Sequence, residues 1–80
     1  MLLDQASLDT LFRVKGVLPS TSTPEVKGQL EDIGFLTGEQ VTVLRKGLFG
    51  KGPILVRVGS STFALRENEA KLIQLEAIAS

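Results

Sequence analysis

The chain has 80 residues, of which nine are basic and nine acidic, and it lacks cysteine, histidine, tyrosine and tryptophan. A chain this short has room for one domain with one core, and no disulfide or thiolate metal site can supplement that core. The balanced charge and the lack of a basic run argue against a phosphate-backbone binder, so no nucleic acid partner is expected.

The first eleven residues are expected to form an N-terminal extension of a single domain that covers residues 1–80. Met1-Leu2-Leu3-Asp4 lacks the basic region of a secretory signal. Nowhere do about eighteen apolar residues run together, so no direct membrane insertion is expected. These features predict a cytoplasmic protein. Ser7 is a candidate N-cap ahead of Leu8 and Leu11, which would suit one short helical turn that leads into the domain.

A strand is predicted over residues 12–18, because apolar and polar residues alternate there with a period of two. Phe12, Val14, Gly16 and Leu18 would share one face, and Arg13, Lys15 and Val17 the other. Proline and three hydroxyl residues follow and end the strand.

A helix over residues 24–33 has the clearest local signals. Thr23 offers a hydroxyl N-cap, and Pro24 suits the first helical position because that position needs no N–H donor. Glu25 places a carboxylate in the positive first turn, and Gly34 supplies a left-handed residue that ends the helix. Its apolar face consists of Val26, Leu30 and Ile33, and such a face is core more often than partner contact, by roughly three to one.

The rest of the chain predicts four strands in addition to the first. Pro53 can open a strand because a first strand residue need not donate to the ladder. Gly59-Ser60 suits a type II′ turn, which would leave Phe63 and Leu65 facing inward. The predicted elements are a turn at 36–39, strands at 40–46 and 53–58, a glycine-rich loop at 47–52, a hairpin strand at 61–65, a helical turn at 66–71 and a closing strand at 72–76.

This order predicts an all-β protein, a small SH3-like barrel of about five strands with one inserted helix and one short helical turn. In such a barrel the sheet curls so that its edges are removed.

Several short motifs occur in a fixed order between residues 12 and 77. They are Phe12-Arg-Val-Lys-Gly16, Thr23-Pro24, Gln29-Leu30-Glu-Asp-Ile33-Gly34-Phe35-Leu36-Thr-Gly38, Val41-Thr-Val43-Leu44-Arg45, Gly50-Lys-Gly-Pro53-Ile54, Phe63-Ala-Leu65-Arg66-Glu-Asn-Glu-Ala70 and Leu75-Glu76. Each motif alone occurs by chance, but their joint order and spacing resembles the ferrous iron transport A (FeoA) family. The chain departs from that pattern in the loop at 46–52, which lacks the family's Ala-Pro pair and its acidic residue before the proline.

The resemblance implies an SH3-like accessory and regulatory protein of bacterial ferrous iron uptake. It implies one partner, the membrane-embedded B component (ferrous iron transport protein B), through the cytosolic GTP-binding domain of that protein. Localisation would then be cytoplasmic, or peripheral to the inner membrane through this partner. The resemblance leaves the oligomeric state and the effect on GTP hydrolysis open.

The candidate partner-binding residues are apolar side chains near loops and helix ends: Leu30, Phe35, Leu36, Leu48, Phe49 and Pro53. Leu48 and Phe49 stand in the glycine-flanked loop, where they either contact a partner or plug one end of the barrel. For Phe35 and Leu36, the sequence favours a place in the core and a contact with a partner equally. Leu30 is expected to be mostly buried.

No catalytic, cofactor or metal site is predicted, and the protein is not expected to be an enzyme. The glycine-rich loop has neither of the phosphate-binding glycine spacings, and without histidine or cysteine a tight ferrous site is not expected. Two alternatives remain: a generic SH3-like interaction module, and a regulatory domain of the metal-repressor type. The first is disfavoured because SH3 grooves use tyrosine and tryptophan to bind proline-rich helices.

Overall fold

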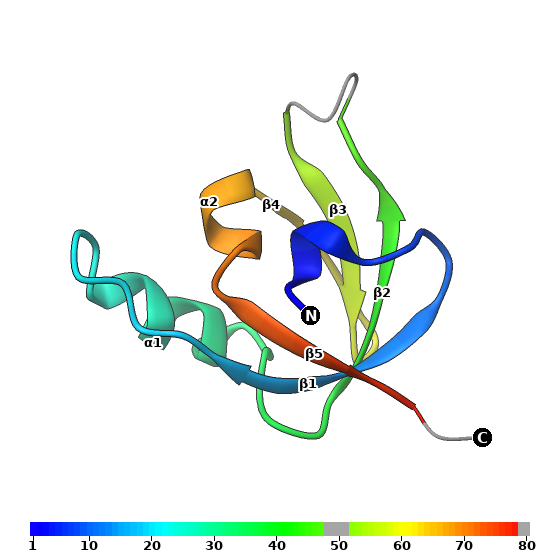
Figure 1. Ribbon diagram of the computed structural model, residues 1–80, viewed down its shortest axis with the longest axis horizontal. Coiled ribbons are helices and arrows are strands. Elements are labelled where there is room, and N and C mark those ends of the chain that lie inside the picture. Colours follow the sequence, from blue (N-terminus) through cyan, green and yellow to red (C-terminus); the bar gives the residue numbers. More distant parts are fainter. Residues whose placement is uncertain (48–51, 79–80) are drawn as a thin grey trace.

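Alternating apolar residues form one antiparallel sheet in the computed structural model, which describes residues 1–47 and 52–78 (Figure 1). The strand order is β4-β3-β2-β1-β5. The described elements are η1 (Leu3–Gln5), β1 (Leu11–Val17), α1 (Glu25–Asp32), β2 (Gln40–Arg45), β3 (Ile54–Val58), β4 (Ser61–Leu65), α2 (Glu67–Ala70) and β5 (Ile73–Ala77). The predicted strands, the inserted helix and the helical turn are thus confirmed.

The core lies on the inner face of the curled sheet, where side chains from every strand meet α1, η1 and α2. Every fully buried side chain among the described residues is apolar. The core consists of Leu3, Ala6, Phe12, Val14, Val17, Leu30, Phe35, Val41, Val43, Ile54, Val56, Val58, Leu65, Ala70, Ile73 and Leu75.

The predicted alternation in β1 holds only as far as Val14. Opposite β5, Val14 pairs with Leu75 and Gly16 pairs with Gln74, so Lys15 is the extra residue of a β-bulge. The bulge shifts the side-chain phase by one residue, and Val17 is therefore buried. The prediction that Gly16 shares a face with Val14, opposite Val17, was wrong for this reason.

The C-terminal end of α1 agrees with prediction, whereas its N-terminal cap does not. Gly34 has a positive φ of 123°. The Gly34 N–H donates to the Glu31 carbonyl at 3.1 Å and the Phe35 N–H donates to the Leu30 carbonyl at 3.0 Å, which is the Schellman pattern. The Thr23 hydroxyl donates to Ser20 Oγ at 3.1 Å and makes no cap bond.

A matched pair of glycine substitutions separates the two backbone environments of α1. We expect Gly34→Ala to lower the free energy of unfolding by about 1–2 kcal/mol, because an L-residue is strained at positive φ. Gly28→Ala should raise it by about 0.5–1 kcal/mol, since Gly28 is an exposed helical residue and its new Cβ meets nothing within 4 Å. Urea unfolding of both variants measures the difference, and equal midpoints would contradict this account.

The β3–β4 hairpin forms as predicted. Gly59 has a φ of 59°, and Val58 pairs with Ser61 across the two-residue turn. The register continues without a bulge to Ile54 and Leu65, so Leu65 is buried and Phe63 packs partly against the core.

The segment that precedes β1 is part of the core packing. Leu3 and Ala6 are fully buried. The Leu75 N–H donates to the Met1 carbonyl at 2.7 Å, and Leu2 bridges Gln74. The helical turn here is η1, earlier than the turn predicted after Ser7. Figure 1 shows η1 beside α2 and on the same side of β5.

The sheet does not close by strand pairing within the described residues. β4 pairs with β3 and β5 pairs with β1, and α2 connects these two outermost strands. The expectation that the sheet removes all of its edges is therefore wrong at β4, because the Met1–Leu2 segment covers β5 alone. No helix in the described part of the chain is long and apolar enough to cross a membrane.

Candidate functional site

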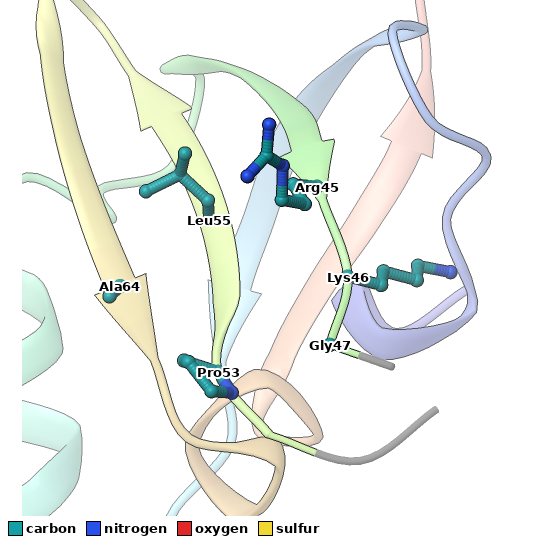
Figure 2. Close-up of a pocket in the computed structure, with 6 residues that line it drawn as sticks. All are labelled: Arg45, Lys46, Gly47, Pro53, Leu55 and Ala64. Atoms are coloured by element: carbon teal, nitrogen blue, oxygen red, sulfur yellow. The ribbon is translucent and has the colours of Figure 1, made fainter. Parts of the chain in front are cut away.

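The outer face of β2, β3 and β4 carries a pocket of about 500 Å³ (Figure 2). It is lined by Arg45, Lys46, Gly47, Pro53, Leu55 and Ala64. The lining is mainly apolar, and the strand residues that form it point away from the core, because their neighbours Ile54, Val56 and Leu65 point inward.

Strand register brings the pocket residues together. Leu55 pairs with Arg45 on one side and with Ala64 on the other, so these three side chains form a row across the sheet. Pro53 lies two residues before Leu55 and therefore on the same face. The small Ala64 side chain leaves room beside Leu55, and the row is hollowed there.

A second β-bulge places Arg45 in this row. Val43 pairs with Val56 and Arg45 pairs with Leu55, so Leu44 is the extra residue. Without the bulge, Arg45 would take the inward phase of Val43. The irregularity therefore turns a guanidinium to the rim of an apolar pocket.

This face of the sheet is basic. Arg57 pairs with Thr42 and Thr62, in the row next to Arg45. The strands β2, β3 and β4 contain no aspartate or glutamate. The salt bridges found among the described residues join Lys27 to Glu31 and Lys71 to Glu67, so neither arginine is neutralised by a described carboxylate.

Lys46 lines the pocket but does not add its charge to the rim. Its Nζ donates to the backbone carbonyl of Asp4 at 3.2 Å. Figure 2 shows the Lys46 side chain directed toward the N-terminal segment and away from Leu55. The rim cation is therefore Arg45, with Arg57 beside it on the sheet.

The predicted contact residues separate into three groups. Leu30 and Phe35 belong to the core, with exposed fractions of 2% and 1%, so neither presents its side chain to a partner in this conformation. Leu36 is 50% exposed. Pro53 is also exposed and lines the pocket. Leu48 and Phe49 lie outside the described residues.

Sequence reasoning missed Arg45, Leu55 and Ala64. Leu55 and Ala64 could have been found, because a two-residue turn at Gly59-Ser60 fixes the register that pairs them. Arg45 could not, because nothing in the local sequence marks the bulge at Leu44.

A smaller pocket of about 200 Å³ lies near the N-terminal segment, and its lining residues include Asp4, Lys46 and Glu67. Asp4 Oδ1 is buried without a hydrogen-bond partner in the described structure. Among the residues described, no three acidic, histidine or cysteine side chains gather closely enough to hold a metal ion.

Comparison with known proteins gives close structural relatives. A FeoA from Stenotrophomonas maltophilia, crystallised with zinc and described as an SH3 domain protein, is 36% identical, covers 95% of this chain and 89% of its own, and superposes with a TM-score of 0.85. Iron(II) transport protein A from Clostridium thermocellum is 28% identical over 98% of this chain and 46% of its own, with a TM-score of 0.81. FeoA from Chlorobium tepidum is 28% identical over 99% of this chain and 71% of its own, with a TM-score of 0.82.

No curated protein matches the chain significantly. The model of the FeoA domain matches residues 1–77, which includes the N-terminal segment that packs into the core. With this match and the shared SH3-like architecture, the chain belongs to the FeoA domain family.

Proposed function

We propose that the protein is a small accessory and regulatory protein of bacterial ferrous iron uptake, which acts by binding the cytosolic GTP-binding domain of the B component. Family membership supports the transport role. The Stenotrophomonas maltophilia relative has been described as a possible bacterial ferrous iron transport activating factor. An accessory role of this kind requires a protein-binding surface.

The observation that carries the proposal is the pocket on the exposed face of β2, β3 and β4. Its apolar floor of Pro53, Leu55 and Ala64 can bury a partner side chain, and Arg45 at its rim can pair with a carboxylate. Apolar anchors in pockets supply much of the affinity of protein interfaces, and charged rims steer association. We assign the contact with the B component to this surface, with the exposed Leu36 as a secondary candidate.

Charge reversal at the rim tests this assignment. We expect Arg45→Glu to weaken binding to the purified cytosolic domain of the B component at least about tenfold, which corresponds to about 1.4 kcal/mol. Its matched control is Lys15→Glu, which changes the net charge equally at an exposed position of β1. That variant should bind like wild type. Isothermal titration calorimetry measures both affinities, and thermal melts confirm that both variants fold.

Measurement of ferrous iron uptake in cells tests the same assignment. A strain without the gene should take up ferrous iron more slowly and recover with wild-type protein or Lys15→Glu, but not with Arg45→Glu. If the wild-type protein fails to bind the cytosolic domain and its loss leaves uptake unchanged, the proposed function is wrong. Equal loss of binding in Arg45→Glu and Lys15→Glu would instead contradict the assignment of the contact to the pocket.

A further inference from the structure

The outer edge of β4 presents free backbone hydrogen-bonding groups. The tight turn makes Val58 and Ser61 a hydrogen-bonded pair, so Phe63 and Leu65 also bond to β3, and Thr62 and Ala64 point their N–H and C=O groups outward. No hydrogen bond found among the described residues involves the backbone of Thr62 or Ala64 on that side. Both residues are exposed.

Within the described part of the chain, this edge has none of the charges, prolines, bulges or covering segments by which proteins usually block strand addition. Edges are commonly protected by lysine, proline, bulges or a covering segment. β4 reads Ser-Thr-Phe-Ala-Leu, without charge or proline, and its pairing with β3 is regular. The opposite edge, β5, is covered by the Met1–Leu2 segment, which bonds to Leu75 and Gln74. Among residues 1–47 and 52–78, a segment of the chain therefore covers the β5 edge and none covers the β4 edge.

The open edge and the pocket are contiguous. The backbone N–H and C=O groups of Ala64 lie at the β4 edge, and the same residue lines the pocket. The outward-bonding residues Thr62 and Ala64 also direct their side chains to the outer face, so a strand added here would place alternate side chains on that face. The residue opposite Ala64 would lie at the pocket, and the residue opposite Thr62 would lie on the side of Arg57.

We propose that β4 accepts an extended segment of the partner by strand addition, and that this segment carries an apolar residue and a carboxylate two positions apart. The apolar side chain packs beside Ala64 and Leu55. The carboxylate reaches across the short Thr62 side chain to Arg57, over a span of two strand spacings or about 10 Å between backbones. The inference rests on the proposed function for the source of the segment, the cytosolic region of the B component.

Charge favours this occupant over a second copy of the chain. Three strands with two arginines and no carboxylate form an electropositive face that selects an acidic segment. Pairing β4 with β4 of another copy would bring Arg57 of each chain to the same edge without an acidic partner in these strands. Main-chain hydrogen bonds would supply affinity and the side-chain alternation would supply specificity, as in other cases of strand addition.

Hydrogen exchange by NMR tests the edge directly, because it reads single amides. In the free protein, the amides of Thr62 and Ala64 should exchange faster than those of Phe63 and Leu65. Addition of the B component's cytosolic domain should slow Thr62 and Ala64 at least about tenfold. A second probe is the blocked peptide Thr-Thr-Val-Thr-Glu-Thr-Thr, which should give the same protection at higher concentration, while its Glu-to-Lys version should not.

A proline substitution at the β4 edge tests strand addition by mutation. Thr62→Pro removes the outward N–H without removing a bond to β3, so the melt should change little while affinity for the cytosolic domain falls at least about tenfold. Thr62→Val keeps the N–H and should bind like wild type. If Thr62→Pro lowers the melting temperature strongly, amide protection in the wild-type protein decides the question.

The outcomes separate the two proposals. Binding of the cytosolic domain without protection of Thr62 and Ala64 would overturn strand addition and leave the proposed function standing. Protection by the peptide together with no binding of the cytosolic domain would support the edge and contradict the proposed function. Protection that rises with protein concentration alone would show that a second copy occupies β4, which overturns the proposed occupant. No protection by either probe would overturn the inference.

Discussion

Leu30→Ala should lower the free energy of unfolding by about 2–5 kcal/mol, because Leu30 is 2% exposed and its loss leaves a cavity between α1 and the sheet. Domains of this length are stabilised by only about 4–12 kcal/mol in total. The melting temperature should therefore fall by roughly 10 °C or more. Circular dichroism melts and urea titrations measure both quantities.

The control for this substitution is Leu36→Ala, six residues along the chain. Leu36 is 50% exposed, so its truncation should change stability by less than about 1 kcal/mol. The pair also separates core from contact: a Leu30→Ala variant that melts like wild type but no longer binds the B component would show that Leu30 faces the partner. In that case the burial of Leu30 would not hold in solution.

Elements with strong local signals were predictable from the sequence. Gly34 ends α1 because only a residue without a Cβ adopts its φ without strain, and Gly59 directs the β3–β4 hairpin for a related reason. Once a two-residue turn is placed, antiparallel geometry fixes the whole register of the hairpin. These features depend on neighbours close in sequence, so periodicity and turn chemistry suffice to find them.

The two bulges and the packing of the N-terminal segment depend on distant partners and could not be predicted in this way. Lys15 and Leu44 are ordinary strand residues, and only the register against β5 and β3 makes them extra. Thr23 has a suitable residue type for a cap, but its hydroxyl bonds to Ser20 instead. Local rules cannot decide between such competing partners.

The candidate site was less predictable than the fold. Sequence reasoning favoured bulky apolar residues near loops, which selected Leu30 and Phe35, and the structure places both in the core. Of the contact residues predicted from the sequence, Pro53 is the one that lines the pocket. The remaining pocket residues are ordinary side chains that become a site only through alignment across three strands, and Arg45 depends on a bulge.

The N-terminal segment supplies the second large stability effect. We expect Leu3→Ala to destabilise the domain by about 2–5 kcal/mol, because Leu3 is 0% exposed and belongs to the central core. The identical substitution at Leu8, which is 48% exposed, should cost less than about 1 kcal/mol. Thermal and urea unfolding of the two variants measure this difference.

Hydrogen exchange distinguishes loss of core packing from loss of edge covering. The Leu75 N–H donates to the Met1 carbonyl at 2.7 Å, so loosening of η1 in Leu3→Ala should expose this amide and accelerate its exchange. The amide of Val56, in the centre of the sheet, should stay protected until global unfolding. If Leu3→Ala and Leu8→Ala unfold at the same urea concentration and Leu75 remains protected in both, residues 1–10 are an extension that the domain does not need for its core. A separation between the variants would show that Leu3 completes the core, and faster exchange of the Leu75 amide in Leu3→Ala alone would show that the first residues also cover the β5 edge.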